Sequence, residues 1–312
     1  MRLLTDLRLP DLPARIEACA PGIEVVQIDN EVGVPADLRG DALFTTGIPG
    51  PHLEALLAPG VGVRWIHLYG TGVDGFPLHL VGDRVLTCSR GSTATATAIA
   101  EWVLAMLLAD AKQLPSSWVD APPAHWYFAS LDTLAGRRLG LVGFGAIGTA
   151  VARRALAFEM SVSALVRTPR VLPEGVECAA DVEFLLADSD YLVLAAPATT
   201  ATRHLLDRGR LARAKPGLRL INVARGSLVD HDALRWALDE GIVAHAYLDT
   251  TEPEPVPAGH WLYTHPGISL SPHISWCEPA AQERVLRLFF ANLERFVRDQ
   301  PLAGRVDPDA GY

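Results

Sequence analysis

Three loops in the second half of the chain carry polar side chains that could assist the reduction of a small acid by hydride transfer. Arg225 follows an apolar stretch, Glu254 lies in a proline-flanked turn, and His273 follows Pro272. Hydride transfer to a 2-oxo acid needs a cation for the carboxylate, a proton donor for the carbonyl oxygen, and a group that keeps this donor protonated. Taken singly, each residue also has an ordinary explanation, as a surface ion-pair partner, a turn residue, or one of ten histidines.

A glycine-rich segment in the middle of the chain is typical of dinucleotide-binding proteins. The segment LGLVGFGAIG (residues 139–148) places Gly143, Gly145 and Gly148 between a predicted strand and a predicted helix. The first glycine permits a tight turn, the second lets the backbone approach a pyrophosphate, and the third lets helix and strand pack closely. The helix start, at Ala146 and Ile147, offers free N–H groups to phosphate. We therefore predict a nicotinamide dinucleotide as cofactor.

The residues after the second predicted strand favour the phosphorylated cofactor. NAD-preferring sites place Asp or Glu about 20 residues beyond the motif, where it bonds the ribose 2′-hydroxyl. That position is Val166 here, and Arg167, Thr168 and Arg170 follow shortly after it. A guanidinium fork matches phosphate oxygens. The sequence therefore predicts NADP(H) as the preferred cofactor, with NAD(H) as the other candidate and a solvated basic loop as the structural alternative.

Apolar runs alternate with helical patterns, which predicts an α/β protein with parallel sheets. Length favours two domains, because 312 residues exceed one ordinary core, and a cleft between them would suit a ligand. Strands are expected at residues 23–28, 42–45, 63–68, 84–87, 138–143, 160–166, 191–195, 218–223, 243–248 and 268–270. Helices are expected at residues 94–112, 146–158, 182–187, 231–240 and 280–298.

Composition excludes several classes of partner. The formal net charge of -9 argues against non-specific binding to nucleic acid or to an anionic membrane. The four cysteines are far apart and form no CxxC pair, which suits reduced thiols better than a disulfide framework or a metal site. Asp6 interrupts the apolar stretch that a signal peptide needs, and the apolar run 94–108 contains Glu101 and is too short to span a bilayer. We expect a cytoplasmic protein.

The loops, taken together and in this order, resemble the D-isomer-specific 2-hydroxyacid dehydrogenase family over nearly the whole chain. Residues 222–226 match its NxARG motif, residues 249–255 its D-x-F-x-x-E-P motif, and residues 272–273 its PH motif. Upstream, residues 69–74 look like its GxGxD substrate loop and Ala100-Glu101 like the start of its domain-crossing helix. Ala196-Pro197 with Thr202 looks like its P-x-T-x-x-T segment.

The resemblance implies a role for each matching residue in the reaction. His273 would be the general acid in reduction and the general base in oxidation, and Glu254 would stabilise its imidazolium form. Arg225 would bind the carboxylate and carbonyl of the substrate. The loop Tyr69-Gly70-Thr71-Gly72 would offer backbone N–H groups to the carboxylate. Asp249 would face the nicotinamide, and the other implied cofactor contacts are Pro197, Thr202, Val223 and Ala224.

The resemblance also implies a fold, an assembly and a substrate. The fold would be two Rossmann-like domains, with a dinucleotide-binding domain at residues 101–283 inserted in a flavodoxin-like substrate domain formed by residues 1–100 and 284–312. The usual assembly would be a homodimer. Glyoxylate and hydroxypyruvate are the expected small 2-oxo acids. The members of the family that act on them commonly have a second strand that, as here, suits NADPH.

The chain departs from the family pattern at a few positions, and three interpretations of its function stay open. Thr250-Thr251 replaces the usual Val-Phe, and Trp102 stands where many members have His. The same fold and residues could act on 3-phosphoglycerate, formate or phosphite. A larger basic substrate pocket would favour a phosphorylated acid. The sequence shows no basic cluster near residues 70–74, although the first domain does carry Arg64, Arg84 and Arg90. A third reading is a non-catalytic, dinucleotide-sensing corepressor, against which stand the acidic charge and the intact Arg225, Glu254 and His273.

Overall fold

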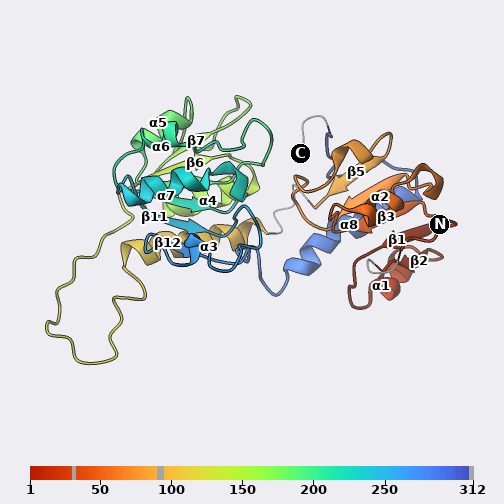
Figure 1. Cartoon of the computed structure of the whole chain (residues 1–312), viewed down its shortest axis with the longest axis horizontal. Coiled ribbons are helices and arrows are strands. Elements are labelled where there is room, and N and C mark those ends of the chain that lie inside the picture. Colours follow the sequence, from red (N-terminus) through yellow and green to blue (C-terminus); the bar gives the residue numbers. More distant parts are fainter. Residues whose placement is uncertain (30–32, 90–94, 309–312) are drawn as a thin grey trace. The chain divides into compact units, whose positions relative to one another are not determined.

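The computed structural model describes residues 1–29, 33–89 and 95–308, and the chain forms two compact units (Figure 1). The first unit is Met1–Ala94 together with Pro279–Tyr312, and the second unit is Thr95–Glu278. The second unit therefore interrupts the first in sequence.

The described residues of the first unit form a five-stranded parallel sheet in the order β2-β1-β3-β4-β5. This is the strand order of flavodoxin-like folds, whose ligands bind outside the carboxyl ends of the strands. The strands are β1 (Arg2–Thr5), β2 (Glu24–Gln27), β3 (Ala42–Thr45), β4 (Trp65–Leu68) and β5 (Val85–Cys88). The three inner strands β1, β3 and β4 are almost entirely buried, as expected for a parallel sheet covered on both faces.

Three helices cover this sheet, and the longest comes from the C-terminal part of the chain. They are α1 (Leu12–Cys19), α2 (Pro51–Leu56) and α8 (Ala281–Val297). Phe289 of α8 stacks on Phe44 of β3 with ring centroids 3.8 Å apart, and Trp65 of β4 lies on the same side. Because this aromatic cluster joins residues distant in sequence, α8 belongs to the core of the first unit.

The second unit contains a seven-stranded parallel sheet in the order β12-β11-β10-β9-β6-β7-β8. Its strands are β6 (Arg138–Val142), β7 (Ser161–Leu165), β8 (Val176–Cys178), β9 (Tyr191–Leu194), β10 (Leu218–Asn222), β11 (Val243–Leu248) and β12 (Ile268–Leu270). Strand order reverses between β6 and β9, which is the switch point of a Rossmann fold. Dinucleotides bind at such a point, outside the carboxyl ends of the strands.

Helices pack on both faces of this sheet. Side chains from α3 (Ala96–Ala111) and α4 (Ala146–Ala157) join one apolar cluster, and those from α5 (Val182–Asp188), α6 (Arg208–Leu211) and α7 (His231–Asp239) join another. The apolar run predicted at residues 94–108 thus belongs to α3, a buried helix. No helix in the described part of the chain combines the length and the apolarity that crossing a membrane requires.

The predicted fold class is confirmed, and every strand and helix predicted from the sequence is present within two residues at either end. Of the strands and α-helices in the described residues, five were not predicted: β1, α1, α2, β8 and α6. All five are short, between three and eight residues. Windows of this length hold too few residues for a periodic pattern to stand out.

A long arm joins α3 to β6 and extends away from the rest of the second unit (Figure 1, yellow). Its base is held by the Lys112 ammonium, which donates to the carbonyl of Asp132 at 2.6 Å, and by Gln113, which donates to the carbonyl of Ser130 at 3.0 Å. Its aromatic side chains are strongly exposed: 72% for Trp118, 59% for Trp126, 97% for Tyr127 and 88% for Phe128.

Candidate active site

The glycine turn lies at the switch point of the second sheet, between β6 and the end of β9. Gly143 has a φ of 96°, and a Cβ there would lie 2.8 Å from the carbonyl oxygen of Ala195. A Cβ on Gly148 would collide with the carbonyl oxygen of Gly143. Gly145 precedes α4, and a Cβ there would meet no atom within 4 Å. The first and third glycines are thus required by packing, whereas the second leaves open space before a helix N-terminus.

Arg170 lies against this turn. Its guanidinium donates to the carbonyl of Phe144 and lies 5.6 Å from the centroid of the Phe144 ring. Arg167 and Thr168 are exposed just after β7, and no carboxylate side chain occurs from Val166 to Pro173. The end of β7, where the cofactor ribose is expected, therefore carries cationic side chains. No Asp or Glu is present there to accept a hydrogen bond from a ribose hydroxyl.

Two further loops along the same edge carry predicted cofactor contacts. The Thr202 hydroxyl donates to the carbonyl of Pro197 at 2.8 Å and accepts from the backbone N–H of Thr199 at 2.8 Å, which closes the loop after β9. Val223 and Ala224 are buried directly after β10. At these positions, the carboxyl edge of the sheet is formed by backbone and small side chains. Such a surface suits a flat ligand.

Arg225 is positioned by a buried asparagine and a glycine. Asn222 is fully buried, and its amide donates to the carbonyl of Arg225 at 2.9 Å and accepts from the backbone N–H of Ala224 at 3.0 Å. Gly226 packs so tightly that a Cβ there would overlap the backbone of Thr251 and Glu252. The loop that carries Arg225 therefore lies directly against the loop that leads to Glu254.

His273 and Glu254 form a hydrogen-bonded pair at the carboxyl end of the same sheet. The distance from His273 Nδ1 to Glu254 Oε1 is 2.5 Å, and the two side chains are 38% and 40% exposed. The other oxygen of Glu254 accepts from the backbone N–H of Thr251 at 3.3 Å. Because Nδ1 is engaged by Glu254, Nε2 is the ring nitrogen left to exchange a proton with a ligand.

Asp249, predicted to face the nicotinamide, is only 1% exposed. Both of its carboxylate oxygens accept hydrogen bonds from residues 271–275, the loop that carries His273. The indole of Trp276 donates to the carbonyl of His273 at 3.0 Å.

The predicted substrate loop lies in the first unit, at the carboxyl end of β4. The backbone N–H of Tyr69 donates to the carbonyl of Thr45 at 2.9 Å, and the carbonyl of Gly70 accepts from the backbone N–H of Ser89 at 3.1 Å. Gly70 and Thr71 are exposed, Gly72 is half-buried, and a Cβ on Gly70 would meet no atom within 4 Å. The loop is therefore anchored at its start and open where a ligand would approach.

The arginines considered for a phosphorylated substrate serve the packing of the first unit. The guanidinium of Arg84 donates to the carbonyls of Leu57, Val63, Leu80 and Val81. Arg64 pairs with Asp41 at 3.8 Å and lies over the ring of Phe296. Arg90 lies outside the described residues. Neither described arginine marks a phosphate pocket.

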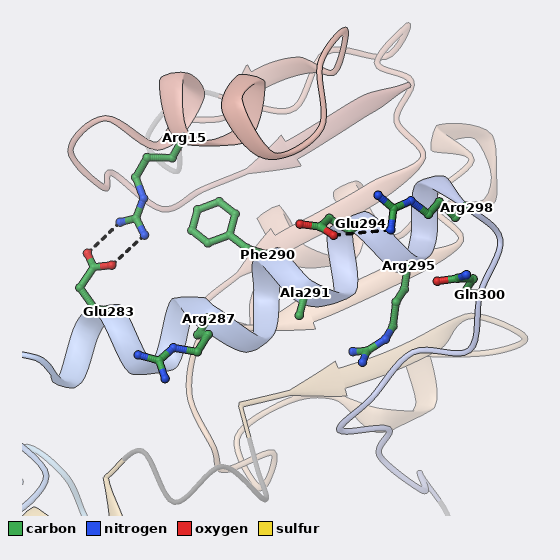
Figure 2. A pocket seen from close by; sticks show the side chains of 9 residues that line it. All are labelled: Arg15, Glu283, Arg287, Phe290, Ala291, Glu294, Arg295, Arg298 and Gln300. Carbon is green, nitrogen blue, oxygen red and sulfur yellow. Dashed lines mark hydrogen bonds and ion pairs between the residues drawn. The ribbon is translucent and has the colours of Figure 1, made fainter.

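A hollow of about 580 Å³ lies along α8 beside α1 in the first unit (Figure 2). Arg15 donates to both carboxylate oxygens of Glu283 at 2.9 Å and lies 4.7 Å from the centroid of the Phe290 ring. Arg287 and Arg295 of α8 border it as well. None of the predicted catalytic or cofactor residues lines this hollow.

Four residues that shape the site were not among the predicted site residues: Asn222, Gly226, Ser271 and Trp276. Asn222 and Gly226 lie inside the NxARG match, and Ser271 and Trp276 flank the PH match. The local signals for Asn222 were its place in the NxARG match and at the end of an apolar strand. Nothing local identifies the contact of Gly226 with Thr251, because those residues are joined only by the fold.

The arrangement combines the parts that reduction of a 2-oxo acid requires. One sheet edge carries a glycine turn and helix N-terminus for a dinucleotide, an arginine for a carboxylate, and a histidine paired with a carboxylate for proton transfer. A comparison with known proteins agrees with this chemistry. Residues 104–275 match the family model described as D-isomer specific 2-hydroxyacid dehydrogenase, NAD binding domain.

Among curated proteins, the chain is similar to hydroxypyruvate reductase of Thermotoga maritima. The two are 31% identical over 234 residues, which cover 74% of this chain and 76% of that protein.

Solved structures, for example the following two, resemble the whole chain as well. A D-isomer specific 2-hydroxyacid dehydrogenase of Xanthobacter autotrophicus Py2, in complex with NADPH and MES, superposes with a TM-score of 0.84 at 27% identity, covering 100% of this chain and 99% of that one. An NADPH-dependent glyoxylate/hydroxypyruvate reductase of Sinorhizobium meliloti, in complex with NADP and sulfate, gives a TM-score of 0.82 at 26% identity with the same coverage. The chain therefore belongs to the D-isomer specific 2-hydroxyacid dehydrogenases, a family of NAD(P)-dependent oxidoreductases.

Proposed function

We propose that this chain reduces glyoxylate or hydroxypyruvate to the corresponding 2-hydroxy acid, with NADPH as the preferred reductant. The observation that carries the proposal is the His273–Glu254 pair at the carboxyl end of the sheet that also holds the glycine turn. The names of the similar proteins, hydroxypyruvate reductase and glyoxylate/hydroxypyruvate reductase, support the choice of substrate.

Each residue of the site has a defined part in the reduction. The bound reduced nicotinamide supplies the hydride. Arg225 binds the carboxylate and polarises the carbonyl of the substrate, which stabilises the negative charge that develops on its oxygen. His273 gives a proton from Nε2 to that oxygen, and Glu254 accepts from Nδ1 and stabilises the imidazolium before transfer.

The proposed binding residues come from the sequences of both units. The loop Tyr69-Gly70-Thr71-Gly72 of the first unit offers backbone N–H groups to the substrate carboxylate, and the open space over Gly70 supports this role. The second unit holds the cofactor at Gly143, Gly145, Ala146, Ile147 and Gly148, with Pro197, Thr202, Val223 and Ala224 along the edge. The backbone N–H groups at the start of α4 would donate to the pyrophosphate of the bound cofactor.

The preference for NADPH is proposed from Arg167 and Arg170, with Thr168 between them. Both side chains follow β7, where no Asp or Glu is present to bond a ribose 2′-hydroxyl, and Arg170 is already held at the glycine turn by its contact with Phe144. Guanidinium groups there would bind the 2′-phosphate.

Replacing Arg167 and Arg170 with Ala should therefore raise KM for NADPH much more than KM for NADH. Charge-assisted hydrogen bonds contribute about 1.5–3 kcal/mol, so we expect an increase of roughly tenfold to a hundredfold for NADPH and little change for NADH. Steady-state kinetics with both cofactors measure it. Arg153→Ala, an exposed arginine on α4, is the matched control.

Equal increases for the two cofactors would contradict the assignment. Because Arg170 also contacts Phe144, the single variant Arg167→Ala separates phosphate recognition from a disturbance of the glycine turn.

We also propose that the chain assembles as a homodimer through the arm between α3 and β6. Exposed aromatic side chains are typical of interfaces and rare on free surfaces, and the arm exposes two tryptophans, a tyrosine and a phenylalanine. Every copy carries the same arm, so a twofold arrangement covers both arms at once. Sedimentation velocity should give twice the mass of one chain, and replacing Trp126, Tyr127 and Phe128 with Ser should shift it toward the monomer.

The activity itself is tested by following NADPH and NADH oxidation with glyoxylate, hydroxypyruvate and pyruvate. We expect turnover with the first two substrates and a preference for NADPH. A protein that binds NADPH and reduces no member of a broad 2-oxo acid panel would contradict the proposed function.

A further inference from the structure

The hollow along α8 has an excess of positive charge. Four arginines and two glutamates line it, together with Phe290, Ala291 and Gln300. The whole chain has a formal net charge of -9, so the sign of this hollow is opposite to that of the protein. A concave surface lined mainly by one sign of charge raises the local concentration of ligands of the other sign. The hollow therefore has the charge of an anion-binding site.

Each glutamate of the hollow is paired with an arginine of its own. Arg15 of α1 donates to both carboxylate oxygens of Glu283 at 2.9 Å. Arg298 pairs with the carboxylate of Glu294, one turn earlier on α8, at 3.7 Å. These two pairs occupy both acidic side chains of the lining, so neither is left for the other two arginines.

Arg287 and Arg295 are the two cations that remain. In the part of the chain that the structure describes, neither guanidinium forms an ion pair, and Figure 2 draws no dashed line from either one. Arg295 donates to the side-chain oxygen of Asn292 at 3.5 Å, which is a long contact with a neutral group. Two positive groups that border one hollow repel each other, and an anion between them would replace this repulsion by attraction.

The spacing of these two arginines leaves room for a ligand between them. They are eight residues apart on α8, and Ala291 lies midway, four residues from each. A helix rises about 1.5 Å per residue, so the two Cα atoms lie about 12 Å apart along the same side of the helix. The small side chain of Ala291 leaves the space between them open. The Phe290 ring, 4.7 Å from the guanidinium carbon of Arg15, forms an apolar wall.

The size of the hollow suits a small organic molecule better than a single inorganic ion. Its volume is about 580 Å³, within the range of small-molecule sites. A guanidinium fork binds phosphate or carboxylate oxygens in a bidentate manner. Two such forks on either side of Ala291 therefore match a ligand with two anionic groups.

We propose that the hollow along α8 binds a small molecule that carries at least two oxyanion groups, phosphate or carboxylate, one held by Arg287 and the other by Arg295. The amide of Gln300 adds a neutral donor beside them. None of the residues assigned to the substrate, the cofactor or proton transfer lines this hollow. The proposal is therefore independent of the reaction proposed for the chain.

The test uses pyrophosphate, citrate and inorganic phosphate as probes, titrated by calorimetry into protein saturated with NADPH. The bound cofactor occupies the phosphate-binding positions proposed at the glycine turn and at Arg167. We expect pyrophosphate, citrate or both to bind at least about tenfold more tightly than inorganic phosphate, because a second charge-assisted contact contributes a factor of this order. The tighter of the two identifies the ligand as a diphosphate or a polycarboxylate. Arg225→Ala, which removes the proposed substrate arginine, should keep this affinity.

The variants separate the two arginines from net charge. Arg287→Gln combined with Arg295→Gln should raise the Kd of the tighter probe by about tenfold to a hundredfold. The matched control combines Arg153→Gln with Arg213→Gln, which removes the same charge from two exposed arginines of the second unit and should leave the Kd nearly unchanged. Ala291→Leu keeps every arginine and places a larger side chain in the hollow, so it should weaken binding as well.

A second measurement locates the probe directly. The methyl resonance of Ala291, assigned by its loss in Ala291→Leu, should shift when the tighter probe is added to the native protein. Without a probe, the variant that lacks Arg287 and Arg295 should reduce glyoxylate as the native protein does. If the native protein reduced no 2-oxo acid, the proposed function would fail, whereas the binding measurements would be unaffected.

Three outcomes would overturn the proposal. One is pyrophosphate and citrate that both bind no more tightly than inorganic phosphate, which would make Arg287 and Arg295 solvated surface groups. Another is a Kd that is unchanged in both the double arginine variant and Ala291→Leu. The third is an equal loss of affinity in the double arginine variant and in its control, because net charge alone would then explain the binding. If the double arginine variant fails to fold, Ala291→Leu and the methyl resonance decide the question.

Discussion

His273→Ala should lose turnover almost completely while it binds NADPH as the native protein does. General acid catalysis contributes about 10²–10⁴ in rate, and the alanine variant has no group left at the end of β12 to give a proton to the substrate. The imidazole pairs with Glu254, and no contact among the described residues joins it to the glycine turn. Single-turnover NADPH oxidation with glyoxylate and a fluorescence titration of NADPH measure the two properties separately.

Controls define what this result means. His79→Ala, an exposed histidine of the first unit, should leave kcat unchanged. Glu254→Gln keeps a side chain that can accept from Nδ1 and removes its charge, so kcat should fall by an intermediate factor. A His273→Ala protein that turned over normally would exclude His273 as the proton donor, and one that lost NADPH binding would move His273 into the cofactor site.

Gly226→Ala is expected to have the second largest effect on activity, although glycine has no reactive side chain. A Cβ at this position would overlap the backbone of Thr251 and Glu252, so the Arg225 loop and the Glu254 loop must separate. Such a separation moves the carboxylate-binding group away from the proton donor, and a misplacement of ~1 Å costs about a hundredfold in rate. Overpacking also lowers stability by about 1–3 kcal/mol.

The measurement is kcat/KM for glyoxylate together with thermal unfolding. We expect kcat/KM to fall by about a hundredfold. The Kd for NADPH should be much less affected, because the glycine turn follows β6 and Gly226 follows β10. Gly209→Ala is the matched control, since a Cβ there would approach only the carboxylate of Asp207, at 3.4 Å. Native kcat/KM in a folded Gly226→Ala protein would show that the contact between the two loops is not needed.

Much of the fold was determined by the sequence alone, because its signals are local. Buried parallel strands appear as short apolar runs, and the longer helices appear as apolar residues at helical spacing. The glycine turn is equally local: Gly143 and Gly148 meet within one strand–turn–helix unit, so their spacing predicts the packing that the structure shows. The strand β1 was not predicted, because the run Arg2–Thr5 is short and lies at the start of the sequence.

Contacts between site residues that follow different strands could be identified only from the tertiary structure. The sequence shows that Arg225, Glu254 and His273 each follow an apolar strand, and parallel strands bring such ends to one edge. It does not show that His273 Nδ1 lies 2.5 Å from Glu254, or that Arg170 reaches back to Phe144.

Asp249 is the sharpest example of this difference. From the sequence it is an acidic residue at the end of a strand, and the family resemblance implies a contact with the cofactor. The fold pairs β11 with β12, so the loop after β12 closes over the Asp249 carboxylate and buries it. Residue types and strand ends follow from local sequence, whereas the partner of each polar group depends on which strands lie side by side, and only the folded sheet decides that.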